Sequence, residues 1–195
     1  VGVLVDPIIL DSLPREEVIA GLGEVIKYGA IRDAHFLNNI SSWLNNIDSF
    51  PFEKAVMRSC AIKAEIVSLD EREGGLRRLL NFGHTIGHAI DAHLGYGKIR
   101  HGEAVALGIK CAGWVSEQLG ILKNDENQLL SDIINKLTLP ILPFMDPNTI
   151  LSFVKKDKKI RSGVLHFVVL DELGKGNTCD TVPDEMIMNS LKAIQ

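Results

Sequence analysis

The sequence predicts a mainly α-helical fold with a short N-terminal strand and a small β-hairpin near the C-terminus. Most of the chain consists of runs of helical length in which apolar residues recur with helical period. β-Branched runs occur only close to the two ends. With 195 residues, 46% of them hydrophobic, the chain is long enough for one core without disulfide or metal cross-links. We therefore expect a single domain over residues 1–195.

Start and stop signals place the individual helices. Pro14 followed by acidic residues is typical of a helix start, since proline suits the first turn and acids favour the positive end of the helix dipole. Gly120 is a typical C-terminal stop. Helices are expected at residues 15–28, 33–47, 52–70, 101–119, 124–137 and 147–156, and after Pro183.

Two regions carry strand signals. Residues 1–5 are apolar and end before Pro7, which predicts a short buried strand. No neighbouring segment offers it a partner, so we expect the chain to belong to something longer. Residues 164–170 are rich in β-branched residues and are expected to pair with residues 177–182 through a turn at Gly174 and Gly176.

Composition excludes several classes of function. The net charge of −4 argues against nucleic-acid binding as the main activity. No run approaches the roughly 20 apolar residues that span a bilayer, and no signal peptide opens the chain. Cys60, Cys111 and Cys179 lack the spacing of a disulfide framework or a zinc ribbon, which fits a cytoplasmic protein.

Histidines concentrate in one segment of the chain. Four of the six histidines lie between residues 84 and 101. His84 and His88 are four residues apart and thus share one face of a helix, and His101 opens the next helix. Imidazole is the commonest metal ligand and titrates near neutral pH, so the segment indicates metal binding or acid–base chemistry. A histidine pair at this spacing more often has a structural role or lies on the protein surface, and that alternative stays open here.

Glycines next to charged residues strengthen the functional interpretation. Gly83 and Gly87 flank the histidines inside an apolar helical run, where each costs about 1 kcal/mol relative to alanine. Gly21 and Gly23 similarly precede Glu24, which lies three residues before Lys27. We expect close backbone approach to a ligand or to another element. For the Glu24–Lys27 pair, the ordinary alternative is an intrahelical ion pair.

Four blocks of the sequence together resemble 3-dehydroquinate synthase. They are Gly-Glu-Val-Ile-Lys-Tyr-Gly at residues 23–29, Leu-Asn-Phe-Gly-His-Thr-Ile-Gly-His-Ala-Ile at 80–90, His-Gly-Glu-Ala-Val at 101–105 and Asp-Lys-Lys at 157–159. Their order is that of the family's C-terminal helical domain, and the resemblance covers essentially the whole chain. The resemblance thus implies the multihelical C-terminal domain of the dehydroquinate synthase-like fold. The family's N-terminal NAD-binding Rossmann-type domain has no counterpart in these residues.

The resemblance implies a lyase of the shikimate pathway, in aromatic amino-acid and chorismate biosynthesis. The family uses Zn²⁺, or Co²⁺ in some members, together with NAD⁺, and converts 3-deoxy-D-arabino-heptulosonate 7-phosphate to 3-dehydroquinate and phosphate. By motif, the metal ligands are Glu24, His84 and His101. His88 then resembles a proton-relay residue, so the resemblance replaces the idea that His84 and His88 clamp a metal as a pair.

Further motif positions resemble substrate contacts. Lys27 is expected to hold the substrate one helical turn from Glu24. Lys63, in apolar sequence surroundings, and Arg77 and Asn81 resemble contacts to carboxylate, hydroxyls and phosphate. Lys158 is the best match within the basic run at residues 155–159, where a slip of one residue is possible.

Other positions match the family less closely. Asp70 and Glu73 resemble positions nearer the substrate or the NAD domain, although such a cluster is most often a solvated helix end. Asp91 replaces the glutamate that the family more often has. Three histidines match no functional position and are assigned to structure or surface: His35, His93 and His166.

Three alternatives remain at this point, and only the last of them belongs to a different class of function. Sister sugar-phosphate cyclases of the 2-deoxy-scyllo-inosose synthase type share the metal ligands and the NAD chemistry. Metal-dependent polyol dehydrogenases typically carry aspartate where Glu24 stands. A non-catalytic metal-binding domain is the third. The resemblance also implies a homodimer for the full-length form, and we expect this chain to be inactive without the NAD domain.

Overall fold

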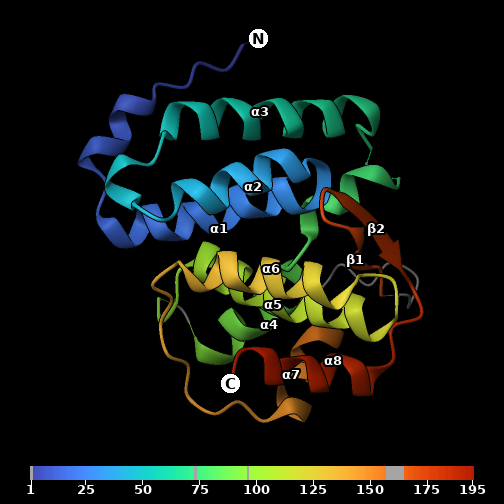
Figure 1. The fold of residues 1–195 in the computed structure, drawn as a ribbon. Coiled ribbons are helices and arrows are strands. Elements are labelled where there is room, and N and C mark those ends of the chain that lie inside the picture. Colours follow the sequence, from blue (N-terminus) through green and yellow to red (C-terminus); the bar gives the residue numbers. More distant parts are fainter. Residues whose placement is uncertain (1, 73, 96, 157–164) are drawn as a thin grey trace.

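The computed structural model describes residues 2–72, 74–95, 97–156 and 165–195. Its helices form two layers (Figure 1). The upper layer contains α1 (Arg15–Arg32), α2 (Ala34–Trp43) and α3 (Phe52–Leu69). The lower layer contains α4 (His84–Leu94), α5 (His101–Gln118) and α6 (Asn124–Asn135), with α7 (Pro147–Lys156) and α8 (Asp184–Ser190) beneath them. The predicted mainly α-helical class is confirmed.

Helix α5 is the centre of the core. It packs against α1, α4, α6, α8 and the first strand, so both layers meet on it. Its middle is almost entirely small or branched apolar residues, and Val105, Ile109 and Val115 are fully buried. A helix that is apolar on nearly all sides is suited to such an interior position. Side chains at the N-terminal end of α5 are consequently held close to both α1 and α4.

The predicted hairpin forms near the C-terminus. β1 (Phe167–Glu172) pairs antiparallel with β2 (Lys175–Cys179). The second strand starts two residues earlier than predicted because Gly174 alone has the left-handed turn conformation, with φ of 87°. The hairpin is tied to both layers: the Gly174 N–H donates to the Ala30 carbonyl at 2.8 Å, and the Leu170 N–H donates to Ser116 Oγ at 3.0 Å.

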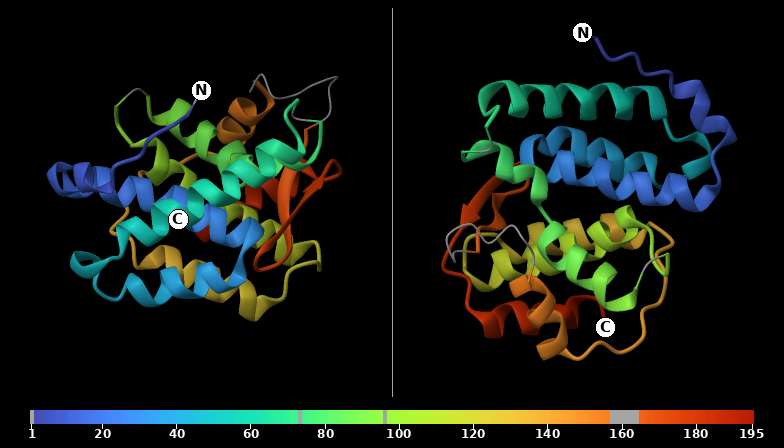
Figure 2. Two further views of the ribbon diagram at one scale, coloured as in Figure 1. Left: turned by 90° about the horizontal axis from the view of Figure 1, so that it is seen from above. Right: turned by 180° about the vertical axis from the view of Figure 1, so that it is seen from behind.

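The prediction of an N-terminal strand is wrong for the residues that the structure describes. Residues 2–6 have no regular structure, and Val3 and Leu4 are 91% and 96% exposed. The segment projects beyond α3 in the right-hand view of Figure 2. A single strand leaves its backbone groups unpaired, so apolar sequence without a neighbouring strand does not form one. Regular structure begins with the 3₁₀ turn η1 (Pro7–Ser12).

Helix boundaries differ from the predicted ones where side chains bond to the backbone. α2 ends at Trp43 rather than near residue 47, because Asn46 accepts from the Asp48 N–H and starts the short 3₁₀ turn η2 (Ile47–Ser49). α1 continues past Tyr28 to Arg32, and Asp33 then caps α2 through the Phe36 N–H at 2.9 Å. Two further 3₁₀ turns are η3 (Leu76–Asn81) and η4 (Leu191–Ala193).

Two exclusions from composition agree with the structure. Cys60, Cys111 and Cys179 are free thiols. Within the described ranges, every helix is too short or too polar to cross a membrane.

Candidate metal and substrate site

Three helices bring the predicted ligands together. Glu24 comes from α1, His84 and His88 from α4, and His101 from the first position of α5. Glu24 Oε1 lies 3.5 Å from His84 Nε2 and 3.7 Å from His101 Nε2. The ring centroids of His84 and His101 are 5.3 Å apart. The ring centroid of His88 lies 5.4 Å from that of His84 and 5.6 Å from that of His101. Residues up to 77 positions apart in the sequence thus form one polar cluster.

His84 has a fixed orientation at the start of α4. Gly83 before it has φ of 77°, and a Cβ there would lie 2.6 Å from Ile109 Cγ1, so this position needs glycine. His84 Nδ1 is 3.1 Å from the Phe82 carbonyl oxygen. Since a carbonyl can only accept, Nδ1 carries the proton of this hydrogen bond, and Nε2 is the nitrogen left for a metal. Nε2 faces Glu24 and His101, which is the arrangement usual for a metal-ligating histidine.

The two oxygens of Glu24 have different surroundings. Oε2 accepts from Lys27 Nζ at 2.5 Å, and Lys27 is only 3% exposed. Oε1 is buried and accepts no hydrogen bond among the described residues. Burial raises the pKa of the Glu24 carboxyl, but Lys27, His84 and His101 together outweigh burial and lower it. Glu24 is therefore a carboxylate with one paired oxygen and one available oxygen.

This donor set fits a divalent metal. Two ligands bound about 2.0–2.2 Å from one zinc ion at a tetrahedral angle lie about 3.3–3.6 Å apart. The distances from Glu24 Oε1 to the two imidazoles are 3.5 and 3.7 Å. One ring nitrogen from each of the three histidines also lies within 4.8 Å of the other two, so geometry alone allows His88 in place of Glu24. The buried, unsatisfied Glu24 oxygen favours the set that contains Glu24, because a bound cation would pair it.

Close backbone contacts set the distance between the helices. A Cβ on Gly102 would lie 1.9 Å from the Ala20 carbonyl oxygen, and one on Gly23 would lie 2.3 Å from the Gly102 carbonyl oxygen. These contacts put Glu24 beside His101. The expected close approach is confirmed at Gly23 and at Gly87, where a Cβ would lie 2.8 Å from the Ala104 oxygen. It is wrong for Gly21, which has open space around it.

The predicted substrate residues lie at varied positions. Asn81 ends η3, three residues before His84, and is half-buried. Arg77 is also in η3, and its Nη1 donates to the Glu71 carbonyl at 2.9 Å. Lys63 is exposed on α3, although it stands in apolar sequence surroundings. Lys158 and Glu73 lie outside the described residues.

Asp70 organises the loop that precedes Arg77. Its carboxylate accepts from the N–H groups of Gly74, Gly75 and Arg77 at 2.7, 2.7 and 2.9 Å. These hydrogen bonds, that of Arg77 first, lower the pKa of Asp70. The sequence had shown a charged cluster here without indicating this turn.

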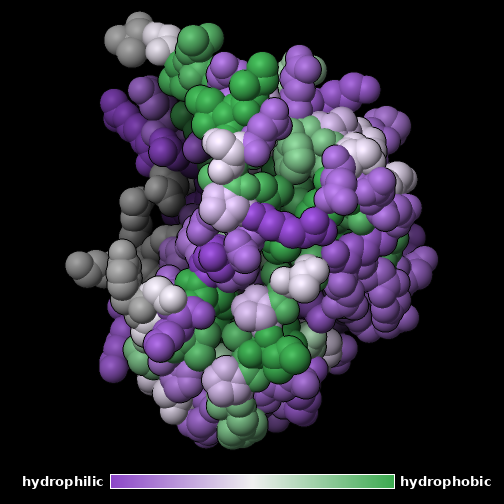
Figure 3. All heavy atoms as spheres, turned by 90° about the vertical axis from the view of Figure 1, so that its left-hand side faces the viewer, coloured by the Kyte–Doolittle hydropathy of each residue, from purple (hydrophilic) through white to green (hydrophobic). Residues whose placement is uncertain are grey.

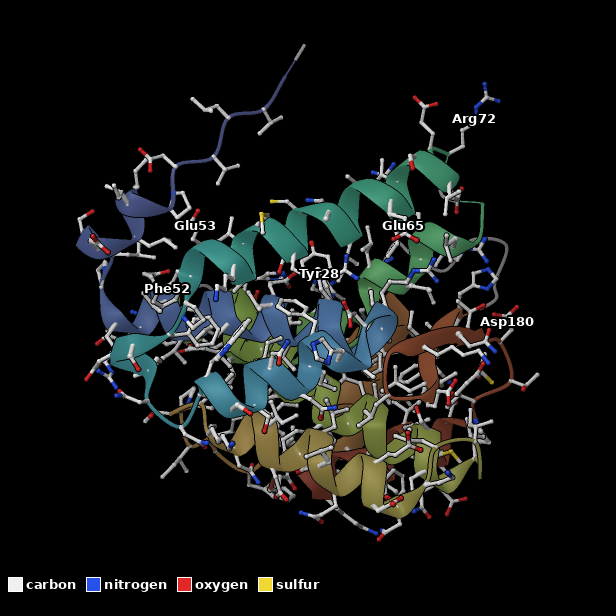
Figure 4. All side chains as sticks on the ribbon, turned by 45° about the horizontal axis from the view of Figure 1, so that its top comes forward. Tyr28, Phe52, Glu53, Glu65, Arg72 and Asp180 are labelled. Carbon is white, nitrogen blue, oxygen red and sulfur yellow. The ribbon has the colours of Figure 1, made fainter. Side chains whose placement is uncertain are left out.

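Tyr28 and Glu103 lie within the matched blocks at residues 23–29 and 101–105, but the sequence assigned neither of them a role. Figure 4 shows Tyr28 between α3 and the helices below it. Burial, followed by the charge of Glu24 and by Cys60, raises its pKa to about 12, so its hydroxyl stays protonated. In α5, Glu103 is a buried carboxylate two residues after His101. A charged residue within an otherwise apolar helical run was the sequence signal that could have indicated this buried carboxylate.

Two of the histidines assigned to structure have structural partners. His93 packs against Phe153 with ring centroids 6.1 Å apart. His166 Nδ1 lies 2.5 Å from Asp180 Oδ1 at the end of the hairpin, and Figure 4 labels Asp180 on that side of the molecule. His35 is exposed.

Together, fold and site define a helical domain whose central helices carry a carboxylate–imidazole cluster suited to a divalent metal. Residues 21–160 match the family described as "3-dehydroquinate synthase C-terminal". The chain belongs to this family.

Curated relatives agree over nearly the whole chain. It is 43% identical over 195 residues to 3-dehydroquinate synthase of Nitrosomonas europaea, covering 98% of this chain and 53% of that protein. It is 40% identical over 200 residues to 3-dehydroquinate synthase of Crocosphaera subtropica, covering 99% and 55%. The chain thus spans about half the length of the curated relatives that it matches.

Two solved structures, both of synthases, share the fold of this chain. 2-Epi-5-epi-valiolone synthase from Streptomyces hygroscopicus subsp. jinggangensis, with NAD⁺ and Zn²⁺ bound, has a TM-score of 0.88 at 23% identity, covering 98% of this chain and 54% of that one. 2-Deoxy-scyllo-inosose synthase, complexed with carbaglucose-6-phosphate, NAD⁺ and Co²⁺, has a TM-score of 0.80 at 24% identity, covering 97% and 55%. These likenesses establish the fold.

Proposed function

We propose that the chain is the metal- and substrate-binding half of a 3-dehydroquinate synthase. The whole enzyme would convert 3-deoxy-D-arabino-heptulosonate 7-phosphate to 3-dehydroquinate and phosphate. One observation carries the proposal: Glu24 Oε1 is buried and unsatisfied beside His84 and His101 Nε2. It occurs in a chain 43% identical to a 3-dehydroquinate synthase over nearly its full length.

In this proposal Glu24, His84 and His101 hold the metal, which is Zn²⁺ or Co²⁺. Bound there, the ion would supply Lewis acidity that lowers the pKa of a substrate hydroxyl. Lys27 holds Oε2 of Glu24 and so keeps Oε1 directed at the imidazoles. Three protein ligands leave room for substrate oxygens, as a catalytic site requires.

His88 is assigned a proton-relay role beside the metal ligands. Its ring lies within 5.6 Å of both His84 and His101, so it borders the same space without being needed as a ligand. An imidazole can take or give a proton near neutral pH.

The remaining proposed residues carry the charges and hydrogen-bonding groups that an anionic sugar phosphate requires. Lys63, Arg77 and Lys158 supply positive charge for carboxylate and phosphate, and Asn81 supplies an amide for hydroxyls. A guanidinium forms paired hydrogen bonds with such oxyanions. The hydrogen bond from the Arg77 N–H to the Asp70 carboxylate holds the backbone of Arg77 in position.

The proposal assigns NAD⁺ and its binding domain to the other half of the protein. NAD⁺ accompanies the metal in the two cyclase structures, and the chain corresponds to about half of each. Without a hydride acceptor, the chain alone is not expected to turn substrate over. For the complete protein we propose a cytoplasmic homodimer.

A sister cyclase is the main competing function. The fold does not separate the two, since the cyclase structures share it. Identity does favour a dehydroquinate synthase, at 43% and 40% against 23% and 24%. Glu24 followed by Lys27 also disfavours a polyol dehydrogenase.

Calorimetric titration of the zinc-loaded chain tests the proposal. We expect the heptulosonate 7-phosphate to bind, glucose 6-phosphate to bind at least tenfold more weakly, and no phosphate to be released with NAD⁺ present. His101→Ala should abolish the metal-dependent binding. Tighter binding of glucose 6-phosphate would support a sister cyclase, and equal binding without metal would refute the site.

A further inference from the structure

Glu103 is a buried carboxylate for which the proposed site has no use. It lies two residues after His101 in α5 and is 6% exposed. Burying a carboxylate is costly unless it is hydrogen-bonded. Glu103 Oε2 accepts from the Arg100 N–H at 2.9 Å, and so satisfies a backbone donor at the start of the helix.

The side chain of Arg100 extends this contact to another helix. Its Nε donates to Glu17 Oε1 at 2.7 Å, and its Nη1 lies 3.8 Å from Glu103 Oε1. Glu17 is in the first turn of α1. One guanidinium therefore joins the first turn of α5 to the first turn of α1, across 83 positions of sequence.

The two helices joined in this way each carry one of the proposed metal ligands. Glu17 and Glu24 are seven residues apart, or about two turns along the same side of α1. His101 is the first residue of α5, and its side chain is 53% exposed. Because so little packs around this side chain, its place depends on the backbone of the first turn. Metal ligands must be held within about 0.5 Å of their working positions.

We propose that Arg100 and Glu103 are positioning residues, which hold the first turn of α5 against α1 so that His101 stays within ligating distance of Glu24. The contact of Gly102 with Ala20 limits how closely the helices approach, and Arg100 limits how far they separate. The inference rests on the metal site of the proposed function. Neither residue is itself a ligand.

Cobalt titration followed by visible absorption tests this role on the 195-residue chain. Arg100→Gln should weaken Co²⁺ binding about tenfold, as expected for groups that orient ligands, and should alter the absorption bands that report ligand geometry. Glu103→Ala should do the same. Glu103→Gln keeps an acceptor for the Arg100 N–H and should retain most of the affinity.

Arg15→Gln is the matched control. Like Arg100, Arg15 stands at the start of a helix and pairs with an exposed carboxylate, in this case Asp48 at 3.0 Å. Unlike Arg100, it does not link α1 to α5. Parent-like affinity and spectrum in Arg15→Gln, with both changed in Arg100→Gln and melting temperatures alike, is the expected result. Parent-like Co²⁺ binding by Arg100→Gln would overturn the positioning role but leave the metal site intact. Equal losses of Co²⁺ affinity in Arg100→Gln and Arg15→Gln would do the same. Failure of the parent to bind Co²⁺ would overturn the metal site and this inference with it.

Discussion

The two carboxylate oxygens of Glu24 have different neighbours. Lys27 pairs with Oε2 inside the protein, while Oε1 faces two imidazole nitrogens. The resemblance at residues 23–29 identified both residues, and their spacing of three predicted only that they share a helix face. Spacing within α1 could not reveal the neighbours of Oε1, since these come from helices 60 and 77 positions further on.

Glu24→Gln should weaken Zn²⁺ binding at least a hundredfold, because an amide oxygen is a poorer and uncharged ligand. Competition with a zinc-binding dye at neutral pH measures this. Glu65→Gln is the control, because Glu65 pairs with Arg32 at the surface, away from the imidazoles. Equal affinity of Glu24→Gln and Glu65→Gln would contradict the ligand assignment.

Asp33 provides a pH test of stability. Burial raises the pKa of Asp33, but the Phe36 N–H and Arg58 outweigh burial and lower it below the usual 3.8. A lowered pKa means that the ionised form stabilises the fold above about pH 4, and that this contribution is lost as pH falls through the folded-state pKa. Asn still caps α2, so Asp33→Asn should cost about 1 kcal/mol at pH 7 and much less at pH 3.

Urea unfolding at the two pH values measures that difference. Asp48→Asn removes an exposed carboxylate, with a side chain 79% accessible, and should have little effect at either pH. A cost for Asp33→Asn that is the same at pH 7 and pH 3 would show that ionisation of Asp33 contributes nothing.

At the scale of elements, the site depends on how closely α1, α4 and α5 pack. Most helix positions followed from the sequence, since proline, acid and glycine signals act locally. Their close contacts did not follow as fully: the glycine pattern indicated close approach, but Gly21 and Gly23 could not be distinguished without the neighbouring helix. The strand at residues 1–5 failed for a related reason, because strand formation depends on a partner that local sequence does not contain.

Gly102→Ala should destabilise the chain by about 1–3 kcal/mol or more, because the new Cβ would meet the Ala20 carbonyl oxygen at 1.9 Å. Gly21→Ala is the matched change on α1, where nothing lies within 4 Å. It should stabilise by about 0.5–1 kcal/mol through helix propensity. Thermal and urea unfolding of both variants checks this, and similar shifts of the same sign would argue against the proposed contact.

At the scale of the whole molecule, the N-terminal segment presents an exposed apolar surface. Figure 3 shows hydrophobic side chains along the top of the face that contains the N-terminal segment. The exposed apolar residues of this segment are Val3, Leu4, Val5, Ile8, Ile9 and Leu13. Further along, Leu10 and Leu13 help to line an apolar pocket with Val18 and Leu22 of α1 and with Phe52 of α3. Surfaces of this kind promote association.

Deleting residues 1–5 should reduce self-association without changing the free energy of unfolding, because the part described is exposed and irregular. Deleting residues 1–13 should destabilise the chain, since it uncovers the pocket beside Phe52. Sedimentation velocity and urea unfolding measure the two effects. Equal destabilisation by both deletions would mean that residues 1–5 pack on the protein.

The most direct measurement is the position of zinc in a crystal of the metal-loaded chain, located by its anomalous scattering. The account predicts one ion bonded to Glu24 Oε1, His84 Nε2 and His101 Nε2, with His88 nearby and unbonded. An ion bonded to His84, His88 and His101 without Glu24, or no ion in the cluster, would contradict it.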